Sequence, residues 1–218
     1  MFKLVHILTD PEAEREKASI ASLSGIVDYG IEYVQEINQP YDGEDWKLVK
    51  NWAHDIYPNH GSRHYGAFTS FKQGVLKNFT EDLDALILCE CDCVLSVTLA
   101  EFSEQIKKSY DFVKDNQLSY YTFGYPSSGM PEFSPKHAED PKHPHSYITD
   151  KIICAHCVML PSHERDFIRS EISSRPWETP DVWFNMVFHT RGPSRFGAMN
   201  QGIAFQHEGF SMIDQRWK

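Results

Sequence analysis

The 218-residue sequence has no long hydrophobic run. Its longest apolar runs, such as Ala85 to Leu88, fall far short of the roughly 20 residues that a membrane-spanning helix needs. No segment has the pattern of a secretion signal. The sequence therefore predicts a protein with no membrane span.

Basic residues are in the minority. The chain carries 21 Lys and Arg residues against 31 Asp and Glu residues, a net charge of -10. This charge repels phosphate backbones and anionic lipid surfaces, so we expect no nucleic-acid partner. A small nucleotide stays compatible with the sequence, because a bound divalent cation reverses the local field inside one cleft.

The cysteines do not form a secreted disulfide framework. There are five, an odd number, in two groups: Cys89, Cys91 and Cys93, then Cys154 and Cys157. This pattern favours a reducing, cytoplasmic location. With 41% hydrophobic residues, the chain is long enough for one substantial core, and we expect a single domain over residues 1–218.

Strand and helix patterns alternate along the chain. A strand at Lys3–Leu8, a helix at 11–27 and a strand at Ile31–Ile37 form the βαβ opening of a parallel sheet. Further helices are expected at Tyr65–Phe79, Phe102–Lys114, Ser162–Ser170 and Pro180–His189, and further strands at Asp84–Cys89, Ser119–Gly124, Ile152–Leu160 and Gly202–Phe205. Residues 41–63 and 126–144 read as loops. The sequence thus predicts an α/β fold.

Two acids follow the most apolar strand. Because side chains alternate along a strand, we expect Cys89, Cys91 and Cys93 to share one face of it, and Glu90 and Asp92 to share the other. Ligands of α/β sheets bind outside the carboxyl ends of the strands. The two carboxylates repel each other there, and a hard divalent cation such as Mn²⁺ or Mg²⁺ would neutralise them. A solvated acid pair is the alternative interpretation.

Three segments resemble one enzyme family. The segment Leu86–Leu95, LILCECDCVL, resembles the acidic motif of GT-A fold glycosyltransferases, particularly family 25, where Glu-Asp-Asp follows an apolar strand. Cys91 stands at the position of the middle acid. His64–Phe71 resembles the glycine-bearing helix start upstream of that motif, and Phe205–Ile213 resembles the closing segment. The three segments occur in the family's order.

The resemblance implies a fold and an activity. The fold is a single GT-A type domain with a Rossmann-like, mostly parallel sheet flanked by helices. The activity is metal-dependent transfer of a hexose from a UDP-sugar to a hydroxyl acceptor, preferably with inversion. Asp92 would bind the metal, Glu90 would lie nearer the ribose, and Cys91 would fall inside the donor-binding motif. His207 stands where many such enzymes place a late metal ligand.

The resemblance also implies roles for the remaining site residues. An inverting transfer needs a base, and Asp181 at a late helix start is the candidate; an acid there also favours the helix dipole without any catalysis. Thr9, Asp10 and Arg15 follow the first strand and would contact the base or ribose of the donor. Lys72 would reach a phosphate. Trp183 would stack on an acceptor sugar or pack in the core.

Two other interpretations stay open. Cys154, His156 and Cys157, together with the earlier cysteines, could form a zinc site. Buried thiols in an apolar row explain the same pattern without a metal. Because Cys91 departs from the family pattern, a non-catalytic nucleotide-binding or carbohydrate-binding domain is the third interpretation.

Overall fold

A computed structural model describes residues 1–8, 13–26, 28–33, 61–124, 141–149, 156–174, 180–191, 196–207, 210–211 and 216–217. The helices are α1 (Glu14–Leu23), α4 (Gly61–Asn78), α5 (Leu99–Asp115), the 3-10 helix η1 (Ser162–Glu164), α6 (Arg165–Ser174) and α7 (Pro180–His189). The strands are β1 (Phe2–Leu8), β2 (Tyr29–Tyr33), β3 (Ala85–Cys89), β4 (Cys93–Leu95), β5 (Tyr120–Thr122), β6 (Ser146–Thr149), β7 (Cys157–Pro161), β8 (Phe196–Met199), β9 (Ala204–Gln206), β10 (Phe210–Ser211) and β11 (Arg216–Trp217).

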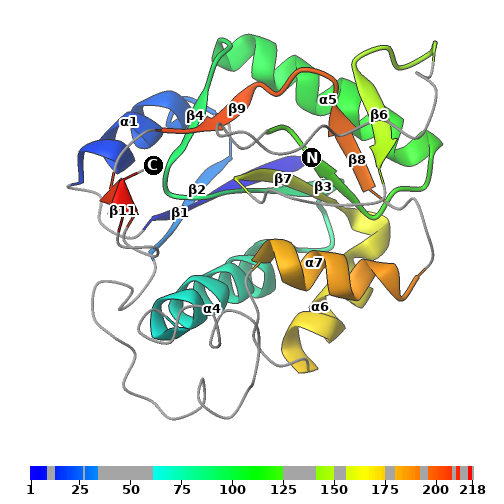
Figure 1. Cartoon of the computed structure of the whole chain (residues 1–218). Coiled ribbons are helices and arrows are strands. Elements are labelled where there is room, and N and C mark those ends of the chain that lie inside the picture. Colours follow the sequence, from blue (N-terminus) through cyan, green and yellow to red (C-terminus); the bar gives the residue numbers. More distant parts are fainter. Residues whose placement is uncertain are drawn as a thin grey trace.

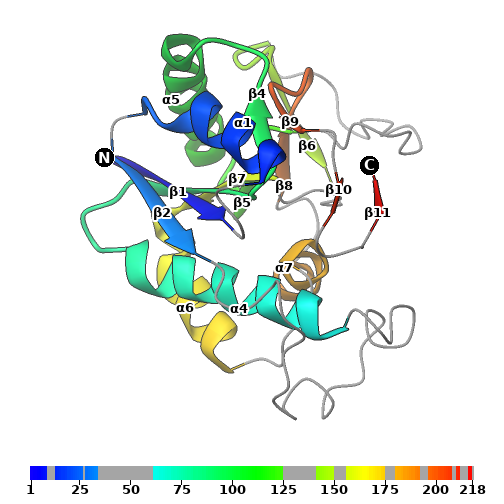
Figure 2. The same cartoon turned by 90° about the vertical axis from the view of Figure 1, so that its left-hand side faces the viewer.

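A seven-stranded sheet in the order β2-β1-β3-β7-β5-β8-β6 forms the middle layer. Helices α1 and α5 cover one face, and α4, α6 and α7 cover the other (Figures 1 and 2). Strands β2, β1, β3, β5 and β8 run in one direction, whereas β7 and β6 run in the opposite direction. The expected α/β fold with a mostly parallel, helix-flanked sheet is confirmed.

The alternation of side chains along β3 divides the core between the two faces. Leu86 and Leu88 pack with the aromatic residues of α4 and α7, including Phe71 and Phe184. Ala85, Ile87 and Cys89 pack on the other face with the apolar side of α5. All five residues of β3 are buried, which explains why this strand is apolar throughout.

Helix α5 shows how local sequence sets the boundaries of an element. Thr98 caps its N-terminus: the Thr98 hydroxyl accepts from the backbone of Glu101, and the Glu101 carboxylate accepts from the backbone of Thr98. This reciprocal capping box satisfies two helix-end donors. The buried positions Phe102, Ile106 and Phe112 then follow at helical spacing.

Several predicted boundaries differ from the structure. The predicted helix 11–27 is the shorter α1, and the predicted strand Ile31–Ile37 lies earlier, at β2, with 34–40 outside the described residues. The late predicted strand at Gly202–Phe205 corresponds to β9, which pairs with β4 in a separate two-stranded sheet. Within the residues that the structure describes, no helix is both long enough and apolar enough to cross a membrane.

Candidate functional site

The acidic motif forms a turn at the end of β3. The backbone N–H of Cys93 donates to the carbonyl of Glu90 at 3.1 Å, which closes a turn through Cys91 and Asp92 before β4 begins. The prediction that the strand continues through these residues is therefore wrong. The turn still brings the two acids together, while Cys91 is only half-buried and does not share the buried environment of Cys89 and Cys93.

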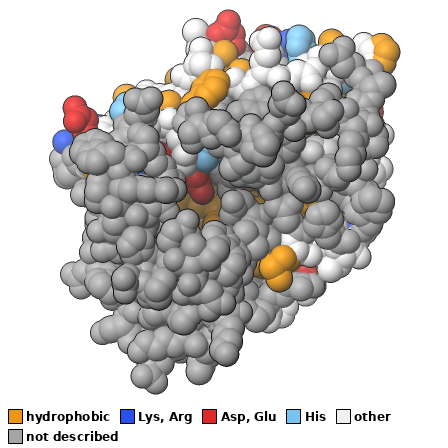
Figure 3. Space-filling model, in the orientation of Figure 1, with side chains coloured by type: hydrophobic (Ala, Val, Ile, Leu, Met, Phe, Trp, Pro, Cys, Tyr) orange, Lys and Arg blue, Asp and Glu red, His pale blue; other side chains and the backbone are white. Residues whose placement is uncertain are grey.

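The position of the turn matches that of a ligand site in an α/β sheet. Strands β1 and β3 are parallel neighbours, with His6 opposite Cys89, so their carboxyl ends lie side by side. Ligands of such sheets bind outside these strand ends. Acidic and histidine side chains lie close together in a hollow on one face of the molecule (Figure 3).

Glu90, Asp92 and His156 form an acid–imidazole cluster. One oxygen or nitrogen atom from each of these side chains lies within 4.8 Å of the others. The Nδ1 atom of His156 lies 3.0 Å from Oε2 of Glu90. His156 is 6% exposed and Asp92 3% exposed, so the cluster sits largely out of bulk water.

His156 joins this cluster through strand pairing. Strand β7 runs antiparallel to β3 with Cys157 opposite Cys89, and the backbone N–H of Glu90 donates to the carbonyl of His156 at 2.8 Å. Sequence reasoning considered His156 only as part of a zinc motif. His156 is 66 positions from Glu90 in the sequence, and their contact depends on the register of two distant strands, which a local pattern does not show.

Arg15 supplies a positive group to the cluster. Its guanidinium forms an ion pair with Oδ2 of Asp92, and both side chains are largely buried. The sequence placed Arg15 at the base or ribose of a donor; the structure places it against the acidic motif. Two carboxylates thus lie beside one guanidinium and one imidazole.

The buried polar atoms near the cluster that have no hydrogen-bond partner among the described residues include Oδ1 of Asp92 and Nδ1 of His207. The backbone N–H of His207 donates to the carbonyl of Asp92 at 2.7 Å, because β9 pairs with β4. The His207 ring is nevertheless not a member of the 4.8 Å group that contains Asp92. A buried acceptor without a partner is unusual and points to a ligand that is not part of the protein.

The other predicted site residues are placed only in part. Asp181 is the second residue of α7, at the predicted helix start, but its side chain is outside the described part of the structure. Thr9 and Asp10 directly follow β1 and also lie outside the described residues. Lys72 lies on α4 and is partly exposed. Trp183 packs in the core against Phe68 and Phe184, as the core interpretation expects.

Three cysteines form a thiol cluster that is separate from the acid–imidazole cluster. The sulfur atoms of Cys89, Cys93 and Cys157 lie within 4.8 Å of one another, and all three residues are fully buried. Burial raises the pKa of the Cys89 thiol well above its usual value, which favours the protonated form. The thiol of Cys157 lies 3.4 Å from that of Cys89, whereas the ring of His156 turns to Glu90. His156 and Cys157, which the zinc interpretation placed in one site, therefore belong to two different clusters.

Comparison with known proteins supports the fold. No protein-family model matches the chain, and no curated protein matches its sequence. The structure is similar to that of a glycosyltransferase involved in the glycosylation of the major capsid of PBCV-1, with a TM-score of 0.50 and 12% identity over 98% of this chain and 96% of that chain. It is also similar to S. aureus TarS, with a TM-score of 0.50 and 10% identity over 94% of this chain and 36% of TarS. These likenesses establish a shared fold; the finer resemblance to glycosyltransferase family 25 is not confirmed.

Proposed function

We propose that the chain is a metal-dependent glycosyltransferase that transfers a hexose from a UDP-sugar to a hydroxyl acceptor with inversion. The observation that carries this proposal is the cluster of Glu90, Asp92 and His156 at the carboxyl ends of parallel strands. The sheet that presents the cluster has the fold of a structure described as a glycosyltransferase. Position and chemistry therefore point to the same activity.

The residues of the cluster suit a divalent cation. Carboxylate oxygens favour Mg²⁺ and Mn²⁺, and an imidazole is also a common ligand of first-row metals. Asp92 offers a buried oxygen with no hydrogen-bond partner among the described residues, and Glu90 and His156 lie beside it. These three residues would hold the cation, with His207 next to them along the backbone. The cation would stabilise the charge on a departing diphosphate.

The donor would lie across the end of β1. Thr9 and Asp10 follow this strand, and we propose that they contact the uridine, with Cys91 at the edge of the same site. Lys72 would meet a phosphate from the side of α4. A nucleotide anion can bind this acidic protein only where its charge is offset locally, which the metal and Arg15 would do.

The transfer step needs a base and a leaving group. The acceptor oxygen attacks C1 of the sugar while the bond from C1 to the diphosphate oxygen breaks, and UDP departs with that electron pair. The acceptor proton moves to the base, for which we propose Asp181 in the first turn of α7. Attack opposite to the leaving group inverts the anomeric carbon.

The test is a binding and turnover measurement on the purified protein. Thermal unfolding is followed with uridine, UDP and a panel of UDP-sugars, each with Mn²⁺ and with a chelator. Ligand binding to the folded state raises the unfolding temperature, so modest affinities are visible. We expect stabilisation by UDP and one UDP-sugar that requires Mn²⁺, together with Mn²⁺-dependent release of UDP when acceptors are added.

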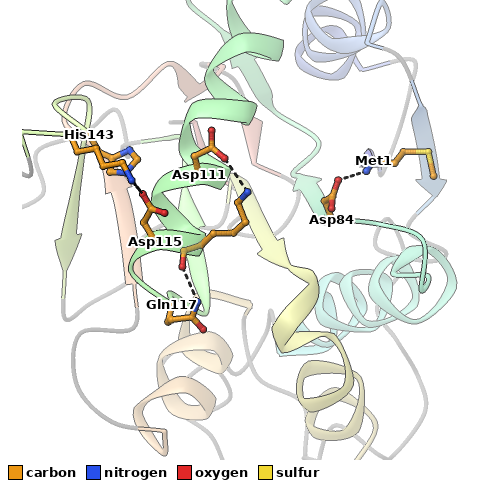
Figure 4. A network of polar contacts seen from close by, with 8 residues as sticks. Met1, Asp84, Asp111, Asp115, Gln117 and His143 are labelled. Carbon is orange, nitrogen blue, oxygen red and sulfur yellow. Dashed lines mark hydrogen bonds and ion pairs between the residues drawn. The ribbon is translucent and has the colours of Figure 1, made fainter.

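A matched pair of variants locates the site. Asp92→Asn should abolish the Mn²⁺-dependent stabilisation by UDP. Asp111→Asn should leave it unchanged, because Asp111 is an exposed residue of α5 that pairs with Lys114 at 3.1 Å (Figure 4). Stabilisation by UDP that persists in Asp92→Asn and still needs Mn²⁺ would show that the acidic motif is not the metal site. Binding without any release of UDP would favour a non-catalytic domain.

A further inference from the structure

One face of α1 is built to hold a cation against the acidic motif. Arg15, Ser19 and Ser22 lie at helical spacing on this face. Each contacts the segment from Asp92 to Leu95: Arg15 pairs with the Asp92 carboxylate, the Ser19 hydroxyl donates to the carbonyl of Cys93, and the Ser22 hydroxyl accepts from the N–H of Leu95 at 2.8 Å. The two serines fix the helix against β4, which places Arg15 beside Asp92.

The position of Arg15 is unfavourable for the helix itself. It lies in the first turn of α1, where the helix dipole favours acids such as its neighbours Glu14 and Glu16. The Arg15 side chain is only 10% exposed and its partner 4%. A buried guanidinium loses its hydration, and the pair with Asp92 offsets that loss. The contact is therefore a tertiary interaction with the site rather than a surface charge pair.

The same aspartate is the central ligand in the proposed metal site. A cation bound at Asp92 would face the guanidinium of Arg15 at close range, and two positive groups in a buried site repel strongly. One carboxylate oxygen pairs with Arg15, while the other is buried with no hydrogen-bond partner among the described residues. Asp92 thus has an internal cation on one oxygen, while its other oxygen has no hydrogen-bond partner among the described residues.

We propose that Arg15 is a built-in counter-cation that competes with the divalent metal for Asp92. Without metal, Arg15 neutralises the buried acid and preserves the shape of the turn. When the metal binds, Arg15 leaves Asp92 and turns to the anion that accompanies the metal. This inference rests on the proposed function for the identity of that anion, the diphosphate of the donor.

The first experiment measures the binding of Mn²⁺ alone, by electron paramagnetic resonance, with no nucleotide present. Arg15→Gln removes the competing charge, and we expect Mn²⁺ affinity to rise on the order of tenfold, within the usual range of coupling between two ligands. Arg15→Lys keeps a positive charge and should bind Mn²⁺ no more tightly than the unmodified protein. Arg165→Gln is the control, because Arg165 pairs with an exposed acid, Asp166, at 3.1 Å on α6. Equal Mn²⁺ affinity in the Gln and Lys variants at position 15 overturns the proposal.

A second measurement needs no variant that removes the charge, in case Arg15→Gln does not fold. Guanidinium signals are observed by nuclear magnetic resonance in protein labelled with ¹⁵N-arginine, and Arg15→Lys identifies the Arg15 signal. Saturating Mg²⁺ should move the Arg15 signal toward that of a solvated guanidinium. The signal of Arg191, which pairs with buried Glu164, should stay in place. An Arg15 signal that Mg²⁺ does not move overturns the proposal.

The outcomes separate this inference from the proposed function. If Arg15→Gln binds Mn²⁺ more tightly but no nucleotide binds, Arg15 competes with the metal and the glycosyltransferase proposal fails. If UDP binds with Mn²⁺ while Arg15→Gln leaves Mn²⁺ affinity unchanged, the function stands and the competition is rejected. If neither the unmodified protein nor Arg15→Gln binds Mn²⁺, the competition is rejected as well.

Discussion

The two carboxylate oxygens of Asp92 have different surroundings. Oδ2 pairs with Arg15, whereas Oδ1 is buried with no hydrogen-bond partner among the described residues. A buried polar atom without a partner costs roughly 1–3 kcal/mol of folding free energy. A ligand at Oδ1 would recover this energy, so we expect the site to bind more strongly than its two acids alone would suggest. The local cost is typical of functional sites.

Asp181 can be tested against its purely structural role. Asp181→Asn should lower the turnover number by roughly 10²- to 10⁴-fold, because a general base contributes about that much, and should leave UDP affinity unchanged. Asp166→Asn is the matched control, since Asp166 is also an acid in a first helical turn, that of α6. Sugar transfer and UDP binding are measured on both variants. A turnover number for Asp181→Asn equal to that of Asp166→Asn would leave Asp181 with only its helix-end role.

His6 predicts a pH dependence of stability. It is fully buried on β1, its ring lies 2.8 Å from the hydroxyls of both Tyr29 and Ser19, and burial lowers its pKa from 6.5 to about 4. Between pH 6.5 and 4 the unfolded chain takes up a proton at His6 while the folded chain does not. Stability from this residue is therefore complete above pH 6.5 and is lost as the pH falls.

Urea unfolding at pH 7 and pH 5 measures this effect. We expect His6 to account for a loss of about 2 kcal/mol between these pH values, since one pKa unit corresponds to about 1.4 kcal/mol. His6→Gln removes the titrating group and should show a loss smaller by that amount. The same loss in both proteins would mean that His6 takes up its proton at the same pH in the folded and unfolded chains.

At the site, sequence reasoning identified the acids and missed their partners. Glu90 and Asp92 could be predicted because they directly follow an apolar strand, which is a local signal. His156 and the true contact of Arg15 could not, because each depends on a register: the pairing of β7 with β3 and the docking of α1 on β4. Such contacts arise from packing between distant segments, so the local sequence pattern does not predict them.

Among the elements, an ion pair of a buried carboxylate connects η1 to the turn that follows α7. Glu164 is 1% exposed, accepts a hydrogen bond from the Ser119 hydroxyl at 2.6 Å and pairs with Arg191. The Arg191 guanidinium also lies over the Phe167 ring, 4.4 Å from its centre. One carboxylate therefore connects η1, the residue before β5 and the turn after α7.

Removing this carboxylate should weaken the fold. Breaking a buried pair typically costs 3–5 kcal/mol, and the partial exposure of Arg191 reduces this to about 2–3 kcal/mol for Glu164→Ala. The control is Glu104→Ala on α5, whose pair with Lys108 spans 3.9 Å between exposed groups and should matter by less than about 0.5 kcal/mol. Urea unfolding of the two variants gives both values. Equal free energies of unfolding for Glu164→Ala and Glu104→Ala would show that the pair of Glu164 with Arg191 adds nothing to stability.

The elements that sequence predicts well are those with long, local patterns. Helix α7 matches its predicted bounds, and α4 was recognised from apolar residues three and four apart. Strands β4, β6 and β8 were missed. They are three or four residues long, which is too short to show the alternation of apolar and polar residues that marks a strand. They form because partner strands complete their hydrogen bonds.

At the scale of the whole molecule, one sheet separates two cores that share its strands. Leu86 and Leu88 of β3 belong to the core under α4 and α7, and Ala85 and Ile87 to the core under α5. Neither face can lose its helices without exposing strands that the other face needs. The molecule should therefore behave as one cooperative unit, as the expected single domain requires.

This cooperativity can be tested with one probe for each face. Trp183 is buried in the core that contains α7, and the thiols of Cys89, Cys93 and Cys157 are buried in the core on the opposite face. The protein is unfolded in urea with Trp183 as its sole tryptophan, the others being replaced by phenylalanine. Fluorescence and the reactivity of the slow thiols toward an aromatic disulfide reagent are followed together. We expect the two probes to give the same urea midpoint, because exposing either core disrupts the shared sheet. If the thiols react at a lower urea concentration than the one that exposes Trp183, the two cores unfold as separate units.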